Sequence, residues 1–323
     1  MAEDGEDAPG LAGVPEWRAV AVGADWHGQR LDRALAALVP EFSRSYLQQL
    51  IDGGAVHLNG AAARKSAARV RIGDAVRVEL RPTQQSQAFV AQPMPLRIVH
   101  EDAHLRVIDK PAGLVVHPAP GNWSGTLLNG LLALDRAAAA LPRAGIVHRL
   151  DKDTSGLMVV ARTRACMDAL VAMIARREVS RQYLALAHRR WQGPATRTVD
   201  APIGRDPRQR LRMAVVDLAR DAGKAARTDF ECLAQAEAGC WLRCTLHTGR
   251  THQIRVHAAS IGHPLVADVL YGGAPAAGLA RQALHAERLA FRHPITGAAL
   301  ALQAPLPDDL RAALAHWGLG YNP

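Results

Sequence analysis

Apolar residues at helical spacing mark two short helices near the start of the chain. Pro40 ends the first, and Ser43 is a suitable N-cap for the second, because a serine side chain accepts a hydrogen bond from the first helical turn. The apolar positions are Leu31, Leu35 and Leu38 in the first helix and Leu47, Leu50 and Ile51 in the second. The pattern predicts two amphipathic helices in one compact unit.

Alternating apolar residues follow these helices and predict short strands. Residues 55–58 run into an Asn-Gly turn at Asn59, and the apolar residues of the segment 70–80 surround a Gly-Asp turn at Gly73. Such turns commonly join antiparallel strands. We therefore expect hairpin-type pairing on both sides of Gly73.

The rest of the chain alternates apolar strands with separated helices. Strands are predicted at residues 104–108, 157–161, 183–187, 228–233 and 240–247, and helices after a Thr126 cap, over residues 167–174 with Val171 facing inward, and from Thr251. No regular strand-helix-strand repeat occurs. This order favours an α+β fold with a mixed, mostly antiparallel sheet.

Composition divides the 323 residues into four parts. Residues 1–17 form an acidic stretch that we expect to be disordered, with ordered structure from about residue 26. The small α+β unit covers residues 28–80, and a segment rich in Pro, Gln and Ser at 81–95 has the composition of a linker. The large domain is expected at residues 96–323, since a chain of this length favours two domains.

The net charge of +9 favours a polyanionic partner. Of the 39 basic residues four are lysines, and the guanidinium group of arginine suits phosphate recognition. A genome that encodes arginine generously would give the same composition. The net charge alone therefore does not identify RNA as the binding partner.

The chain shows no targeting or membrane signal. Its first residues carry carboxylates without an apolar run, and no stretch reaches about 18 uninterrupted apolar residues, so we expect a cytoplasmic location without membrane attachment. The four cysteines, Cys166, Cys232, Cys240 and Cys244, form no C-x-x-C pair. We expect buried thiols and no structural zinc site.

The densest polar segment, residues 148–156, lies between two apolar runs. A loop between buried strands presents its side chains from a rigid base. Arg149 and Lys152 flank Asp151 and favour its ionised form, as a nucleophile or base requires. The pattern alone leaves open whether Asp151 or Asp153 acts.

The histidines allow a metal hypothesis, in which His148 joins the nearby aspartates, or His252 joins His257. The second pair is five residues apart and diverges on a helix, unlike a pair at positions i and i+4. We therefore expect no metal.

Several segments resemble the RluA-type pseudouridine synthase family. H-R-L-D-K-D-T-S-G-L at residues 148–157 is similar to the family's catalytic signature. The segments that agree in order and spacing are D-K-P-A-G-L-V-V-H-P at 109–118, S-R-Q-Y-L-A-L at 180–186, T-G-R-T-H-Q-I-R-V-H at 248–257 and H-P-L-V-A-D-V-L-Y-G at 263–272. The resemblance covers residues 96–305. The chain departs from it with Arg181 where many members have Lys, and with Ala267 where Gly is frequent.

The helix-helix-strand unit resembles the S4 RNA-binding domain. The resemblance rests on R-L-D at residues 30–32, S-R-S-Y at 43–46 and V-H-L-N-G at 56–60. It implies a basic face toward the RNA backbone, for which the candidates are Arg30, Arg33, Arg44, Arg64 and Lys65. A solvated basic surface is the alternative for each of these side chains.

The family resemblance assigns roles in the large domain. It implies that Asp151 is the catalytic carboxylate and that Arg255 forms an ion pair with it. It also implies that Tyr183 stacks on the target base and helps to remove the proton from C5. Arg149 would fill the gap left when the target nucleotide leaves its helix.

The implied activity is the isomerisation of uridines in structured RNA, and the subtype resembled acts on large-subunit ribosomal RNA or its precursor particle. The reaction consumes no water and no redox equivalent, so no cofactor is expected, and we expect a monomer. One alternative is a noncatalytic S4-containing RNA-binding factor for ribosome assembly. Another is a glycoside or nucleoside hydrolase, which usually needs two opposed carboxyl groups.

Overall fold

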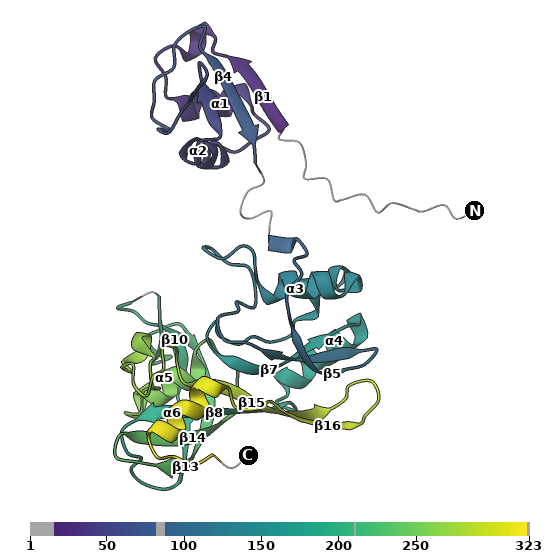
Figure 1. The fold of residues 1–323 in the computed structure, drawn as a ribbon, viewed down its shortest axis with the longest axis vertical. Helices are drawn as coiled ribbons and strands as arrows, with labels where there is room; N and C mark the ends of the chain where they lie inside the picture. The colour runs from purple at the N-terminus through teal and green to yellow at the C-terminus, as the bar shows by residue number, and fades with distance from the viewer. Residues whose placement is uncertain (1–15, 82–87, 210, 322–323) are drawn as a thin grey trace, which may run out of the picture. The chain divides into compact units, whose positions relative to one another are not determined.

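The computed structural model describes residues 16–81, 88–209 and 211–321. Two compact units emerge from its contacts, Met1–Gln87 and Ala88–Pro323 (Figure 1). Each unit combines helices with mostly antiparallel strands, which confirms the predicted α+β class. No helix in the described ranges is long and apolar enough to cross a membrane.

The first unit packs two helices on a four-stranded antiparallel sheet of order β1-β4-β2-β3. Its elements are β1 (Glu16–Ala21), η1 (Ala24–Trp26), α1 (Leu31–Leu38), α2 (Arg44–Asp52), β2 (Val56–Leu58), β3 (Ala61–Ala62) and β4 (Ala75–Leu80). Both helices begin and end near the predicted residues, and the Ser43 hydroxyl accepts a hydrogen bond from the Tyr46 amide at 3.3 Å. The inner faces of the helices form one core with β2 and β4.

Two predictions for this unit are wrong. β1 begins at Glu16, so ordered structure starts about ten residues earlier than expected. The predicted disordered tail 1–17 overlaps the first two residues of this strand, and its residues 1–15 lie outside the described part. The segment before Gly73 also forms no hairpin with β4, which pairs with β1 and β2 instead. The reason is tertiary, since Val70 is buried in the helical core and β1 offers β4 a six-residue partner.

The second unit is built on a nine-stranded sheet of order β5-β6-β7-β15-β8-β14-β13-β9, with β16 paired to β15. Its strands are β5 (Arg97–Glu101), β6 (Leu105–Lys110), β7 (Ser155–Ala161), β8 (Ser180–His188), β9 (Thr196–Asp200), β13 (Arg227–Gln235), β14 (Gly239–Leu246), β15 (Leu284–Arg292) and β16 (Ala299–Gln303). β15 and β7 run parallel, and the other pairs are antiparallel. The predicted mixed sheet is confirmed.

Short elements surround this sheet. They are α3 (Leu127–Leu134), η3 (Arg136–Ala140), η4 (Pro142–Gly145), α4 (Arg164–Ala175), α5 (Gln253–Ser260), η5 (Val269–Tyr271), α6 (Asp308–His316) and a small sheet of β10 (Ile203–Arg205), β11 (Met213–Val215) and β12 (Gly223–Lys224). α3 and α4 cover opposite faces of β7, whose residues alternate between two apolar cores. This explains the unbroken apolar run of the strand, because both of its faces are buried.

Two boundaries and the exposure of one side chain differ from the sequence predictions. The predicted linker 81–95 ends earlier, because the chain from Ala88 on belongs to the second unit, where the Asn129 side chain donates to the Val90 carbonyl at 2.8 Å. α5 begins two residues after Thr251, since His252 adopts a left-handed conformation with φ 57°. Val171 is 46% exposed although its spacing placed it on the inner face of α4.

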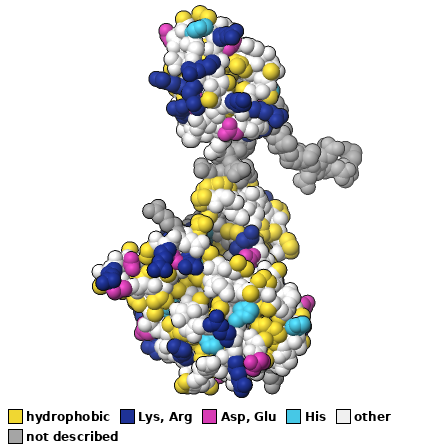
Figure 2. Space-filling model, turned by 90° about the vertical axis from the view of Figure 1, so that its left-hand side faces the viewer, with side chains coloured by type: hydrophobic (Ala, Val, Ile, Leu, Met, Phe, Trp, Pro, Cys, Tyr) yellow, Lys and Arg dark blue, Asp and Glu magenta, His cyan; other side chains and the backbone are white. Residues whose placement is uncertain are grey.

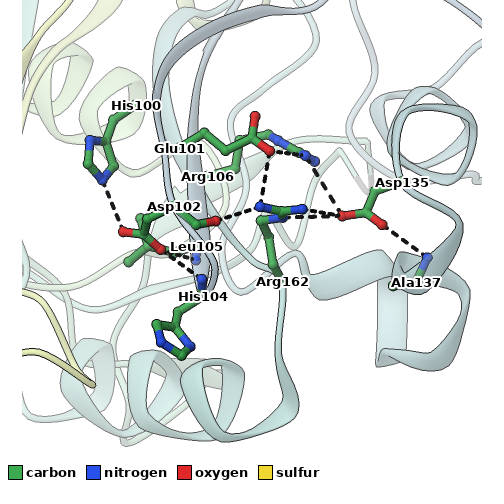
Figure 3. Close-up of polar contacts among 9 residues, drawn as sticks. All are labelled: His100, Glu101, Asp102, His104, Leu105, Arg106, Asp135, Ala137 and Arg162. Atoms are coloured by element: carbon green, nitrogen blue, oxygen red, sulfur yellow. Dashed lines mark hydrogen bonds and ion pairs between the residues drawn. The ribbon is translucent and has the colours of Figure 1, made fainter.

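A charged cluster joins the β5–β6 hairpin to residues that follow β7 and α3 (Figure 3). Arg106 donates to Glu101 at 2.7 Å, and Arg162 donates to Asp135 at 3.1 Å. The Asp102 carboxylate is partly desolvated, but amide hydrogen bonds from His104 and Leu105 outweigh burial and hold its pKa at about 2. Oppositely charged groups surround one another here, as in a purely structural network.

Candidate active site

A cleft of about 330 Å³ opens on the second unit. It is lined by the loop that carries H-R-L-D, the carboxyl end of α4, the start of β8 and the segment from β14 into α5. The structure brings together four residues predicted to act here, namely Arg149, Asp151, Tyr183 and Arg255. Asp153 is not among the lining residues, so the geometry favours Asp151 of the two aspartates.

Arg255 joins two carboxylates. Its Nε and one terminal nitrogen donate to the two oxygens of Asp268 at 2.7 Å each, and its other terminal nitrogen donates to Asp151 Oδ2 at 3.1 Å. The Tyr271 ring lies below the guanidinium at 4.9 Å. A bidentate carboxylate fixes the plane of a guanidinium. Arg255 therefore presents one nitrogen to Asp151 in a fixed direction.

Arg255 stays charged in this setting. Burial by itself lowers the pKa of a guanidinium, but the hydrogen bonds and negative charges of Asp268 and Asp151 outweigh burial and raise the pKa of Arg255. The ion pair that the family resemblance implied is present in the geometry. Sequence reasoning missed Asp268, although the segment H-P-L-V-A-D-V-L-Y-G was a signal that this region belongs to the site.

His252 lies near the other oxygen of the Asp151 carboxylate. Its Nε2 lies 3.8 Å from Asp151 Oδ1, and its Nδ1 lies 2.8 Å from the Tyr271 hydroxyl, which accepts a hydrogen bond from the Met213 amide. Burial lowers the pKa of His252. A neutral ring can therefore accept the Tyr271 proton at Nδ1 and turn Nε2–H toward Asp151. Sequence reasoning assigned no role to His252 or Tyr271.

Tyr183 comes from β8, opposite Cys244 of β14, and reaches the cleft from the apolar core. It is 5% exposed, and burial raises the pKa of its phenol to about 12. The side chain is thus a neutral phenol at pH 7. Arg149, by contrast, is exposed at the cleft, where it can reach a bound polymer.

Lys110 supports the loop that carries Asp151. Its ammonium is fully buried and donates to the carbonyls of Pro111, Leu114 and Lys152 at 2.8, 3.0 and 2.9 Å. Burial lowers the pKa of Lys110 to about 8. One side chain therefore ties the D-K-P segment to the residue that follows Asp151.

Two further contacts hold the same loop. The His148 Nε2 accepts a hydrogen bond from the Val159 amide at 3.0 Å, and burial lowers the pKa of His148 to about 3, so the ring is neutral and structural. Arg281 donates to the Asp153 carbonyl at 3.0 Å. The position of Asp151 is thus set by residues far apart in sequence.

Ala267 and the four cysteines, which stood out in the sequence, have defined settings in the structure. Ala267, where the family often has Gly, adopts a left-handed φ of 58° one residue before Asp268, which explains why glycine suits this position. The four cysteines are free thiols, three of them buried. The described residues contain no group of three or more His, Cys, Asp or Glu placed to hold a metal ion.

Comparisons with known proteins agree with this geometry. Residues 29–76 match the S4 domain model, and residues 104–260 match the model of the RNA pseudouridylate synthases. The chain belongs to the RNA pseudouridylate synthase family, with an additional S4 domain, and is an RNA pseudouridine synthase.

Several similar proteins carry one name. Ribosomal large subunit pseudouridine synthase D of Nitrosomonas europaea is 49% identical over 295 residues, which cover 89% of this chain and 84% of that protein. The protein of the same name from Xanthomonas campestris pv. campestris is 48% identical over 301 residues, covering 89% and 88%. The solved structure of human RNA pseudouridylate synthase domain containing 1 is 26% identical, with a TM-score of 0.55 over 70% of this chain and 90% of that one.

Proposed function

We propose that this chain isomerises specific uridines of large-subunit ribosomal RNA, or of its precursor particle, to pseudouridine, as a cytoplasmic monomer. Relatives named ribosomal large subunit pseudouridine synthase D support the substrate, because the similarity spans most of both chains. The observation that carries the chemistry is the Asp151 carboxylate, held in the cleft by Arg255 at 3.1 Å.

In the proposed reaction, the bond between ribose C1′ and uracil N1 breaks and a bond between C1′ and C5 forms. C5 loses a proton and N1 gains one, so atoms balance without water, a redox partner or a cofactor. Asp151 supplies the carboxylate that attacks or stabilises the electron-poor centre. Arg255 keeps that carboxylate charged and aimed, because Asp268 fixes its guanidinium from the other side.

In this proposal Tyr183 contacts the target base, and Arg149 fills the place that the target nucleotide leaves. Tyr183 offers an aromatic face beside Asp151, and the target base stacks on it after leaving its helix. With a pKa near 12, Tyr183 assists removal of the C5 proton as a neutral phenol and not as a preformed phenolate. Arg149, exposed at the cleft, takes the place of the extruded nucleotide.

The S4 unit supplies affinity for the RNA backbone. Its candidates are Arg30, Arg33, Arg44, Arg64 and Lys65, all of them exposed. Arg30 and Arg44 bind the two oxygens of buried Asp32 at 3.0 and 2.9 Å, which fixes their direction while their side chains stay about half exposed. Basic side chains stand at several places on the face of this unit in Figure 2. Such an arrangement suits phosphate contacts.

The two rival functions fit the cleft less well. A glycoside or nucleoside hydrolase usually needs two opposed carboxyl groups. Among the described residues that line the cleft, Asp151 alone carries a carboxyl group. A noncatalytic assembly factor has no need for a carboxylate fixed by a buried arginine.

The deciding experiment replaces Asp151 by Asn. We expect the D151N chain to bind ribosomal RNA nearly as well as wild type and to form no pseudouridine, as read by carbodiimide mapping of RNA from a deletion strain carrying each variant. Asp153→Asn makes the same charge change in the same loop outside the cleft and should retain product. Pseudouridine formation by D151N would disprove the role of Asp151, and release of free uracil by wild type would indicate a hydrolase.

A further inference from the structure

Three arginine side chains are buried in the described ranges, and two of them meet carboxylates. Arg106 binds Glu101 (Figure 3), and Arg255 binds Asp268 and Asp151. The third is Arg181, which is 6% exposed and has neither a hydrogen bond nor an ion pair with any described residue. A buried cation without a counter-charge is unfavourable. The described residues therefore supply no counter-charge for Arg181, which suggests that a ligand supplies it.

Arg181 lies in the wall of the active-site cleft. It precedes Tyr183 by two residues on β8, so both side chains leave the same face of the strand. The guanidinium lies against Gly249, where an added Cβ atom would come within 2.9 Å of a terminal nitrogen of Arg181. The absence of a side chain at position 249 thus keeps room for the cation.

The charge of the surrounding cleft identifies the missing partner as an anion. Besides Arg181, its lining includes Arg177 and Arg250, and the one lining carboxylate among the described residues, Asp151, is already bound to Arg255. Uracil is neutral until its glycosidic bond breaks, whereas the phosphodiesters of RNA are permanent anions. Arg181 and Tyr183 are two residues apart on the strand, so their Cα atoms are separated by roughly 7 Å. If the target base stacks on Tyr183, Arg181 is therefore placed to contact the part of the RNA next to that base.

We propose that Arg181 binds a backbone phosphate of the RNA next to the target uridine, with its guanidinium held in the room that Gly249 leaves for it. This inference rests on the proposed function, since it requires an RNA substrate in this cleft. The phosphate neutralises the buried cation, and the charge-assisted hydrogen bonds anchor the backbone while the base occupies the space beside Tyr183. Arg181 is thus a substrate-binding residue distinct from the Asp151–Arg255 pair.

The test combines a protein variant with a modified RNA. The substrate is a ribosomal RNA fragment that wild-type chain converts to pseudouridine, made with one neutral methylphosphonate at a time at the linkages flanking the target. We expect Arg181→Met to weaken RNA binding about ten- to hundred-fold and to reduce the salt slope of log Kd by about 0.7 to 0.9. At one linkage the methylphosphonate should weaken wild type by a similar factor and leave R181M unaffected.

If Arg181→Met and the methylphosphonate weaken binding independently at every flanking linkage, so that their effects on the binding free energy add, the proposed phosphate contact is wrong. A lower kcat with unchanged Kd would overturn it too, because the charge would then act on the base. Failure of the proposed function is a separate outcome, namely that wild type modifies no ribosomal RNA fragment.

Stability separates a binding role from a structural one. Because R181M removes an unpaired buried charge, we expect its melting temperature to equal or exceed that of wild type; a clear decrease together with lost binding would mean that Arg181 only supports the fold. Arg181→Lys should restore part of the affinity. Arg176→Met is the matched control, since Arg176 is exposed outside the cleft, paired with Glu178, and should bind RNA like wild type.

Discussion

Asp268 is the residue whose replacement tests the arrangement around Asp151 most directly. It is 2% exposed and holds Arg255 through two hydrogen bonds of 2.7 Å. Two charges about 4 Å apart interact by about 4 kcal/mol at an effective dielectric constant of about 20. Breaking a buried ion pair costs about 3 to 5 kcal/mol, because the remaining charge stays desolvated.

Asp268→Asn keeps one acceptor oxygen and removes the charge. We therefore expect the free energy of unfolding of the second unit to fall by about 3 kcal/mol, the lower part of that range. Activity should fall as well, because Arg255 loses the partner that fixes its plane. A displacement of about 1 Å at a catalytic group reduces a rate by about a hundred-fold, so we expect a ten- to hundred-fold lower kcat with RNA affinity unchanged.

Urea unfolding followed by tryptophan fluorescence, and single-turnover pseudouridine formation at saturating RNA, measure the two effects. Asp308→Asn serves as the control, since Asp308 forms an exposed ion pair with Arg311 and should change neither quantity measurably. A D268N chain with the wild-type unfolding midpoint and wild-type kcat would refute the reasoning that Asp268 holds Arg255 in place.

Two further predictions concern the loop that carries Asp151. Gly156→Ala should lower the unfolding free energy by at least about 2 kcal/mol and impair activity, because Gly156 has φ 111° and a Cβ would lie 2.2 Å from the Ala286 carbonyl oxygen. Urea unfolding measures the effect on stability. Gly320→Ala is the control, because a Cβ at Gly320 would have no atom within 4 Å. Lys110 has a pKa of about 8 in the fold, below the ordinary value of 10.5 for a lysine, so the unfolded state holds more protons between these pH values. The unfolding free energy of wild type, measured relative to that of Lys110→Met, should therefore rise by up to about 3 kcal/mol between pH 8 and pH 10.5. A difference between the two chains that does not change with pH would contradict the burial of Lys110.

Local patterns predicted much of the fold. The two helices of the first unit follow from Pro40, Ser43 and the spacing of their leucines, since caps and amphipathic periodicity act within a few residues. The apolar run of β7 predicted a buried strand for the same reason. Motifs predicted the family and four residues of the cleft.

Pairings between distant segments were beyond the reach of the sequence. A turn signal at Gly73 indicated a local hairpin, but β4 pairs with β1, more than fifty residues earlier, because that pairing also covers the helical core. The amino-terminal boundary was misplaced for the same reason. A strand of exposed and half-buried residues, such as β1, carries little apolar signal of its own.

The sequence by itself determined the chemical class of this protein, because the loop 148–156 and the strand of Tyr183 are contiguous motifs whose residue types suit the reaction. Only the tertiary structure decided how Asp151 is held: Arg255 lies between Asp151 and Asp268, and Lys110 fixes the loop from another strand. It also left Arg181 buried without a partner. Ion pairs and burial depend on distances between side chains that the chain brings together from far apart, and those distances exist only once the sheet has formed.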